Sequence, residues 1–296
     1  MQKPKITVIG SVNMDLVTTT SVRPKVGETV LGQSFSNVPG GKGANQAVAA
    51  ARLGSNVNLI GCVGNDAFGH ELRTHLKKEK VTLLEVKRNT TKQTGIAQIT
   101  LSDNDNSIIV VPGANEDLTP SVLDHFENVI AESDILLLQL EIPIETVEYA
   151  ISLAATHGVP VILNPAPIQL LSAQMLEKVA YVTPNEHEAD VLSSMEGVDL
   201  TDNLIVTKGK HGVSFWENTQ EINIKSHAVD VVDTTGAGDA FNGALAVAIS
   251  EGKSVRDACL FATAVGALAV TRLGAQSGMP TSDEVEEFLS KLEKKS

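Results

Sequence analysis

Positive charge is scarce in this sequence, and so are long apolar runs. It carries 23 Lys and Arg residues against 36 Asp and Glu residues, which gives a formal net charge of −13. Nucleic acids and anionic membranes are held by clustered Lys and Arg side chains, so we expect neither as a partner. The longest apolar stretch, Ala258 to Val270, is shorter than the roughly 20 residues that cross a membrane, and it is typical of a buried helix.

Cysteine is nearly absent. Cys62 and Cys259 lie far apart in the chain, which favours reduced thiols in the core of a cytoplasmic protein. The apolar run that follows Met1 to Lys5 is too short for the core of a signal peptide. The histidines show no metal-binding spacing, because His70 and His75 are five residues apart and do not share a helix face.

Strand-like and helical patterns alternate along the chain. Its 296 residues are 42% hydrophobic, enough for one large core, and nothing reads as a linker, so we predict a single domain over 1–296. The alternation predicts an α/β fold with a mostly parallel central sheet flanked by helices. The predicted strands are Lys5 to Ile9, Val57 to Val63, Ile135 to Leu140, Val159 to Leu163, Tyr181 to Thr183 and Leu204 to Thr207, and helical stretches include Ala44–Leu53, Ser121–Ala131 and Thr146–His157. Binding residues should collect at the carboxyl ends of the strands, which are followed by Asn13, Glu141, Asn164 and Asn185.

Two segments break this alternation. Thr94 to Leu101 and Ser107 to Val111 alternate apolar and polar residues around a turn rich in Asn and Asp, which predicts a β-hairpin. Leu16 to Phe35 is also strand-like and is interrupted by Pro24. We predict that segments 16–35 and 94–111 together form a small second sheet.

The most informative stretch is Asp233-Thr234-Thr235-Gly236-Ala237-Gly238-Asp239, which leads into an apolar helical run, Ala240 to Ile249. Small residues let backbone N–H groups approach an anion, and the following helix adds unpaired donors and a positive dipole end. Asp239 places a carboxylate at the junction. An anion site with a built-in base suits phosphoryl transfer to an alcohol.

Other glycine motifs do not fit. A dinucleotide-binding fingerprint needs a third glycine where Phe241 stands. A Walker loop needs Ser or Thr after its lysine, but Gly43 follows Lys42, and Ser36 occupies the position of the earlier glycine.

A second glycine cluster, Pro39 to Ala47, opens an alanine-rich helix. Together with the Gly236–Asp239 loop, it resembles the paired motifs of the ribokinase-like sugar kinases. Further motifs extend the resemblance over nearly the whole chain: Gly10-Ser11-Val12-Asn13-Met14-Asp15, Gly61-Cys62-Val63-Gly64-Asn65-Asp66, Gln139-Leu140-Glu141-Ile142-Pro143 and Thr183-Pro184-Asn185-Glu186-His187-Glu188. The resemblance implies that the small sheet is a lid over the active site and the contact surface of a homodimer.

The resemblance also implies an activity and its residues. The activity is ATP-dependent phosphorylation of D-ribose at its 5-hydroxyl, which gives D-ribose 5-phosphate. Asp239 would take the proton from that hydroxyl, while the amides around Gly236, Ala237 and Gly238 hold the developing charge. The positions that bind ribose match Asn13, Met14, Asp15, Gly41, Lys42, Gly43, Ala44, Asn45, Glu141 and Asp239.

Nucleotide and metal positions are implied in the same way. Asn185 is assigned to the nucleotide phosphates, and Glu188 to the Mg²⁺ environment through water. The nucleotide-binding turn matches Thr207, Lys208, Gly209, Lys210, His211 and Gly212, with Gly238 and Asp239 beside it. An activating K⁺ ion would be held by Asp233, Thr235, Ala269, Arg272 and Gly274. The family's cation-binding serine falls at Gly278, with Ser277 displaced by one, so Ser277 or water would replace that ligand.

The sequence departs from these kinases between Glu188 and Leu204. Only fifteen residues, 189–203, lie there, where the family usually places an additional helix. A crossover needs about a dozen residues, so Glu186 to Met195 can still form the connecting helix.

Structural readings and other functions compete with this interpretation. Asp239 could be a helix cap, Gly40–Gly43 a turn that enters a helix, and Asn185 a helix start. A kinase for deoxyribose, another pentose or a nucleoside is one alternative, and the loop Asn13-Met14-Asp15 disfavours it. A sugar-binding regulator without catalysis is another, and the intact Asp239 loop disfavours that.

Overall fold

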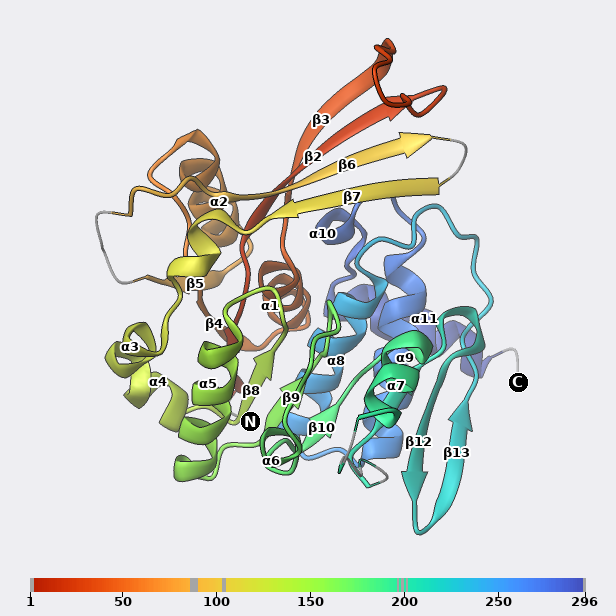
Figure 1. Cartoon of the computed structure of the whole chain (residues 1–296). Coiled ribbons are helices and arrows are strands. Elements are labelled where there is room, and N and C mark those ends of the chain that lie inside the picture. The colour runs from red at the N-terminus through yellow and green to blue at the C-terminus, as the bar shows by residue number, and fades with distance from the viewer. Residues whose placement is uncertain are drawn as a thin grey trace.

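A parallel sheet of six strands forms the centre of the protein, in the order β10-β9-β8-β1-β4-β5 (Figure 1). The computed structural model describes residues 3–85, 90–102, 105–195, 197, 200 and 202–294. The strands of this sheet are β1 (Lys5–Ile9), β4 (Asn56–Ile60), β5 (Val81–Leu84), β8 (Ile135–Leu138), β9 (Val161–Leu163) and β10 (Tyr181–Val182). Each neighbouring pair runs parallel, which confirms the predicted α/β class.

Helices cover both faces of this sheet. Ile135 and Leu137 on β8 belong to one core cluster and Leu136 and Leu138 to the other, because successive side chains of a strand point to opposite faces. The first face is covered by α1 (Lys42–Arg52), α2 (Ala67–Lys78), α8 (Ala237–Ser250), α9 (Val255–Ala269) and α11 (Ser282–Glu293). The second is covered by α3 (Pro120–Leu123), α4 (Glu127–Ala131), α5 (Ile144–His157), α6 (Ala173–Leu176) and α7 (Glu186–Ser193). Burial on both faces explains why the central strands β8 and β9 are apolar throughout. No helix in the described ranges is long and apolar enough to span a membrane.

The last predicted strand differs from expectation. β11 (Ile205–Thr207) pairs with β12 (Val213–Glu217), which pairs with β13 (Gln220–Ile224), and both pairings are antiparallel. Single parallel bridges, Val182 to Leu204 and Asn185 to Thr207, connect this three-stranded sheet to the end of the main one. The short strand β11 pairs with β12, the next strand in the chain. The alternation of strands and helices did not predict this contact.

Two other elements also differ from expectation. The helix predicted over Ser121–Ala131 is interrupted by a 3-10 turn, Asp124–Phe126, which divides it into α3 and α4. β5 was not predicted, because its four residues are too few for a clear pattern. In the short connection 189–203, α7 ends at Ser193, and residues 196, 198, 199 and 201 lie outside the described residues.

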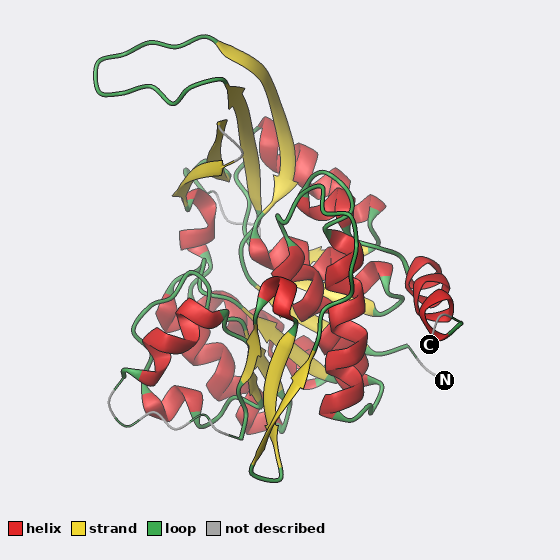
Figure 2. Ribbon diagram, turned by 90° about the vertical axis from the view of Figure 1, so that its right-hand side faces the viewer, coloured by secondary structure: helices red, strands yellow, loops and turns green. Residues whose placement is uncertain are grey.

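The two segments that were predicted to form a small second sheet contribute the strands of a separate four-stranded sheet. Its strand order is β3-β2-β6-β7. Its strands are β2 (Asn13–Thr20), β3 (Gly32–Gly40), β6 (Gly95–Ser102) and β7 (Asp105–Val111). This small sheet projects away from the helices and the main sheet in both views (Figures 1 and 2). Asp103 and Asn104, in the predicted hairpin turn, lie outside the described residues.

Close packing of α1 against α8 places the two helices that frame the site. A Cβ added at Gly243 would lie 2.6 Å from the Cβ of Ala49 and 2.8 Å from the carbonyl oxygen of Gln46, so only glycine permits this approach. The first turn of α8 is thereby brought beside the first turn of α1.

Candidate active site

Asp239 lies at the start of α8 with its carboxylate almost completely buried, 7% exposed. Oδ2 accepts a hydrogen bond from Asn45 Nδ2 at 2.9 Å, and Oδ1 accepts one from Gln46 Nε2 at 3.0 Å. Burial raises the pKa of Asp239, and this outweighs the charge of Lys42 and the two amide donors, which lower it. The site therefore holds a carboxylate that is oriented by two donors and more basic than a surface aspartate.

The glycine loop presents a helix N-terminus next to this carboxylate. Gly236 is the N-cap of α8 and has a φ of 77°, a left-handed conformation that favours glycine. The amides of the first turn have no acceptor within the helix, and the positive end of the helix dipole lies with them. A Cβ at Gly238 would meet nothing within 4 Å, so the space above the loop is open to a ligand.

Lys42 stands among four carboxylates. Burial lowers the pKa of Lys42, but the negative charges of Asp239, Glu141, Glu188 and Asp15 raise it overall. Lys42 is consequently charged and able to stabilise an anion at this point. The structure thus brings together side chains from β2, α1, α7, α8 and the segment after β8.

Glu141 and Asp15 both lie against the second glycine cluster. Oε2 of Glu141 accepts hydrogen bonds from the Ser11 hydroxyl at 2.5 Å and from the Lys42 amide at 3.1 Å, at the N-terminus of α1. A Cβ at Gly40 would lie 2.3 Å from a carboxylate oxygen of Asp15. Burial, followed by the charges of Glu141 and Asp239, raises the pKa of Asp15 to about 7.

The remaining glycines of this cluster let α1 start directly against the end of β1. Gly41 has a φ of 90°, and a Cβ there would lie 2.7 Å from the amide nitrogen of Asn13. At Gly43 a Cβ would lie 2.6 Å from the backbone of Gly10. Close backbone contact therefore explains the run of glycines.

A cavity of about 900 Å³ opens beside the glycine loop. Of the residues predicted to bind nucleotide, those that line it are Asn185, Thr207, Gly209, Lys210, Gly212 and Gly238. Gly238, Asn185 and Thr207 also line a smaller cavity of about 140 Å³ that contains Asp239 and Lys42. A ligand in the large cavity can thus reach Asp239 past Gly238.

Several predicted residues lie elsewhere. Lys208 directs its Nζ to Glu221 at 3.2 Å, and the exposed His211 lines neither cavity. Met14 and Ala44 are fully buried in the first core cluster and line neither cavity.

Glu188 and Asn185 form a capping box at the start of α7. This agrees with the alternative interpretation of Asn185 as a helix start. Asn185 Oδ1 accepts from the Glu188 amide and Glu188 Oε2 accepts from the Asn185 amide, each at 2.8 Å. The capping box uses only Oε2, so Oε1 of Glu188 remains for a ligand. Glu188 is buried and lines the small cavity, and burial raises the pKa of its carboxyl group. A single carboxylate at a phosphate-sized cavity fits Mg²⁺ held through water and phosphate. In the described part of the chain, no cluster of three or more His, Cys, Asp or Glu residues could hold a metal by itself.

Asp233 ties the glycine loop to the turn after α9. Its Oδ1 accepts from the Thr235 amide at 2.9 Å and its Oδ2 from the Gly274 amide at 2.8 Å. Although burial raises its pKa, these bonds hold the pKa of Asp233 below the ordinary value. A Cβ at Gly278 would lie 2.3 Å from the carbonyl oxygen of Ala269 and 3.5 Å from that of Arg272, so a serine would not fit at this position. Residues predicted to hold K⁺ therefore lie close together.

The sequence reasoning named Asn164 as a strand-end residue but missed three other polar residues around Asp239, which are Gln46, Thr183 and Asn242. Gln46 donates to Asp239 and to Asn164 Oδ1, the latter at 3.2 Å. Asn242 accepts from the Thr183 hydroxyl at 2.6 Å and donates to the Gly238 carbonyl at 2.9 Å. Asn164 at a strand end and Gln46 within the glycine cluster carried a usable signal, but Thr183 and Asn242 did not, because their pairing spans 59 positions.

Comparisons with known proteins agree with this geometry. A family model described as pfkB family carbohydrate kinase matches residues 3–282. A ribokinase from Bacillus subtilis (strain 168) is 48% identical over 290 residues, 96% of this chain and 99% of the relative. The crystal structure of a Thermotoga maritima ribokinase matches with a TM-score of 0.87 at 38% identity, over 96% of this chain and 99% of that one. Arabidopsis thaliana ribokinase complexed with ribose and ATP also has a TM-score of 0.87, at 32% identity, over 98% of this chain and 99% of that one.

The raised pKa of Asp15 predicts a pH-dependent cost in the ligand-free protein. The folded chain keeps the Asp15 proton up to about pH 7, whereas the ordinary pKa is 3.8. The free energy of unfolding should therefore fall as the pH rises from about 4 to about 7, by up to about 4 kcal/mol for this group. Asp15→Asn should remove this fall, as measured by urea unfolding across that range. Asp190→Asn, at an exposed position on α7, is the control, and wild-type and Asp15→Asn curves that stay parallel would refute the assignment.

Proposed function

We propose a function for this chain from one premise: it belongs to the pfkB family of carbohydrate kinases. The activity that the site supports best is ATP-dependent phosphorylation of D-ribose at its 5-hydroxyl, which yields D-ribose 5-phosphate and ADP. The observation that carries it is the buried carboxylate of Asp239, at a helix N-terminus in the small cavity, which shares Gly238 with the large one. Near-full-length similarity to ribokinases, one of them solved with ribose and ATP, supports ribose as the sugar.

Asp239 acts as the base in the proposed reaction. As the sugar hydroxyl oxygen bonds to the γ-phosphorus, its proton passes to the Asp239 carboxylate and the bond from phosphorus to the ADP oxygen breaks. Amides of the first turn of α8 and the Lys42 ammonium stabilise the charge on the transferred group. The raised pKa of Asp239 suits this role, because a more basic carboxylate takes the proton more readily.

Polar groups beside Asp239 hold the sugar. Asp15 and Glu141 accept hydrogen bonds from sugar hydroxyls, and Asn45 and Lys42 donate to them. Asn13 Oδ1 already accepts from Asn115 at 2.7 Å, which leaves its amide NH₂ to donate to the sugar. Such paired groups discriminate against a sugar that lacks the matching hydroxyl, since they would be left without a partner.

Metal ions assist the nucleotide side of the site. Mg²⁺ near Glu188 would neutralise phosphate charge and orient the γ-phosphoryl group. A K⁺ ion beside Asp233 would be held by that carboxylate and by carbonyls of Thr235, Ala269, Arg272 and Gly274. In this structure the Ser277 hydroxyl donates to the Leu273 carbonyl at 2.5 Å, so water is the simpler replacement for the family's serine.

Two alternatives are less well supported. A kinase for deoxyribose, another pentose or a nucleoside would use the same base, and a panel of these acceptors separates them by turnover. A non-catalytic sugar-binding regulator would have no need for a carboxylate held by two donors at the glycine loop.

Cys62 and Cys259 form no disulfide, which supports the cytoplasm as the compartment.

Asp239→Asn tests the proposed activity. The amide keeps the shape of the carboxylate but accepts no proton, so ribose-dependent turnover of ATP should fall by about 10² to 10⁴ while ribose affinity stays within a few-fold. Asp283→Asn, at an exposed aspartate in the first turn of α11, is the matched control and should retain full activity. Turnover of Asp239→Asn close to that of wild type would exclude Asp239 as the base.

The K⁺ proposal predicts cation-dependent turnover. Replacing K⁺ with tetramethylammonium at constant ionic strength should lower turnover severalfold or more, with less effect on ribose affinity, because the ion fixes the loop that stabilises the charge and does not touch the sugar. Equal rates in the two salts would contradict it.

The small sheet supports the proposed lid and homodimer. β7 is exposed along its whole length, with Ile108 51% and Ile109 64% exposed, and Phe35 on β3 is 65% exposed. Exposed apolar side chains gathered on one sheet are typical of an interaction surface. Ile109→Lys should shift the protein from dimer to monomer in sedimentation velocity, and Leu170→Lys, at an 87% exposed leucine on a loop outside the small sheet, should not. A wild-type monomer at micromolar concentration would refute the homodimer.

A further inference from the structure

We propose that Gln276 is a positioning residue for Asp239, acting through Asn45, and that His75 sets the orientation of the Gln276 amide. The inference rests on the proposed function, because it concerns the base of that reaction. Neither residue lines either cavity. They act on Asp239 from behind the site.

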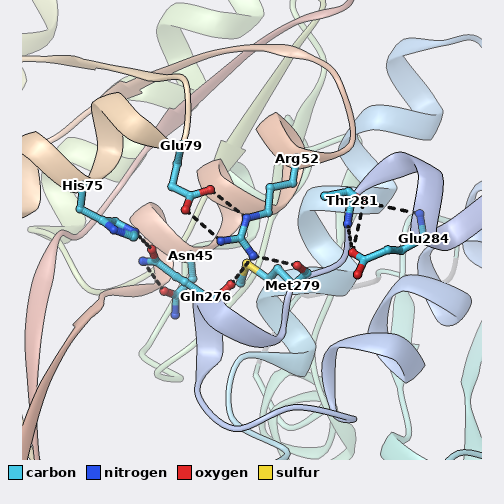
Figure 3. A network of polar contacts seen from close by, with 8 residues as sticks. All are labelled: Asn45, Arg52, His75, Glu79, Gln276, Met279, Thr281 and Glu284. Carbon is cyan, nitrogen blue, oxygen red and sulfur yellow. Dashed lines mark hydrogen bonds and ion pairs between the residues drawn. The ribbon is translucent and has the colours of Figure 1, made fainter.

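A line of hydrogen bonds leads from α2 to the carboxylate. Gln276, on α10 (Ala275–Gly278) and 3% exposed, donates from Nε2 to Asn45 Oδ1 at 2.9 Å (Figure 3). Asn45 in turn donates from Nδ2 to Asp239 Oδ2 at 2.9 Å. At the other end, His75 Nε2 lies 2.7 Å from Gln276 Oε1.

The chemistry of these groups gives the line one direction. An amide oxygen only accepts, so His75 must donate from Nε2 to Gln276 Oε1. Gln276 must then turn its NH₂ group to Asn45, and Asn45 must turn its own NH₂ group to Asp239. If Asn45 were reversed, two acceptors, its carbonyl oxygen and the carboxylate, would face each other at a buried position, which is unfavourable.

The backbone of Gln276 is fixed separately from its side chain. Arg52 donates from one guanidinium nitrogen to the carbonyls of Gln276, at 2.6 Å, and Met279, at 2.8 Å (Figure 3). Its other nitrogens form a two-point ion pair with Glu79, at 2.8 and 2.9 Å. Directly after this turn, a capping box between Thr281 and Glu284 starts α11. A change in the Gln276 side chain therefore leaves the course of the chain in place.

Asp239 thus receives two donors that are each held from behind. Gln46, which donates to Oδ1, accepts from Gln139 Nε2 at 2.6 Å through its own amide oxygen. Gln276 plays the corresponding part for Asn45 and Oδ2. The supporting residues Gln276 and Gln139 come from different segments of the chain. The hydrogen bonds from Gln276 through Asn45 can therefore be altered while those from Gln139 through Gln46 remain.

The decisive variant is Gln276→Met, which keeps the length of the side chain and removes the donor without adding charge. Without its partner, Asn45 should hold Asp239 less well, and a carboxylate that loses a donor has a higher pKa. We expect turnover with ribose and ATP at neutral pH to fall by about 3- to 30-fold, and the acid limb of the turnover profile to move by about 0.5 to 1 unit toward higher pH. Lys42, Glu141 and Asp15 also face Asp239 and stay unchanged, so the difference from wild type reports the lost donor.

A second pair of variants tests the same line at a less buried position. His75→Leu removes the donor to Gln276 and should shift the acid limb in the same direction, whereas His75→Gln keeps a donor and should restore the wild-type profile. Glu79, the C-cap residue of α2, and Arg52 on α1 are the charged groups beside His75, and both are retained. His70→Leu, at an exposed histidine of the same helix, is the matched control.

The outcomes separate this inference from the proposed function. If the wild type shows no ribose-dependent turnover of ATP, the proposed function fails. If the wild type turns over while folded Gln276→Met and His75→Leu both keep the wild-type acid limb and a rate within about twofold, the positioning role alone is wrong. A loss of thermal stability without a moved acid limb would show a purely structural role and would also overturn it.

Discussion

Burial of the Asp239 carboxylate is the constraint that the surrounding elements satisfy. A carboxylate that is 7% exposed is costly to keep ionised unless hydrogen-bond donors and positive charge compensate for lost water. The fold supplies both: the side-chain amides of Asn45 and Gln46 near the start of α1, the Lys42 ammonium, and the positive end of α8. Each of these groups requires α1 and α8 to begin side by side, which the absence of a side chain at Gly243 permits.

Local pattern was enough to predict the parts of this arrangement that lie on single segments. The strand β1 was predicted with its observed bounds, and the glycine loop with its following helix identified Asp239, because turn, helix start and carboxylate are contiguous in the chain. The small sheet was also predictable, since its strands alternate in a way that buried parallel strands do not. Strand-end position likewise pointed to Asn164, which lies beside Gln46.

The remaining contacts depend on distance in space and could not be read from the pattern. Gln276 meets Asn45 across 231 positions of sequence, and no local feature marks it as different from any polar residue in a turn. The antiparallel pairing of β11 was missed for a related reason. Two isolated parallel bridges connect this segment to the main sheet, but the continuous hydrogen-bonded pairing of β11 is with β12, the first strand of the hairpin that follows it. Even Lys208, in the predicted nucleotide-binding turn, lines neither cavity and directs its charge to Glu221, because β13 lies there.

The distribution of charge also explains why metal ions belong to the proposed reaction. Asp15, Glu141, Glu188 and Asp239 act on Lys42 together, and burial, followed by the charges of Glu141 and Asp239, raises the pKa of Asp15 to about 7, so negative charge in the ligand-free site is already costly. A nucleotide adds further negative charge at the same point. Helix dipoles and the Lys42 ammonium offset only part of this negative charge, because their effects are short-ranged and modest. In the proposed reaction a divalent cation at the phosphates would balance this charge, and Glu188, whose carboxylate would otherwise repel the nucleotide, would hold that ion.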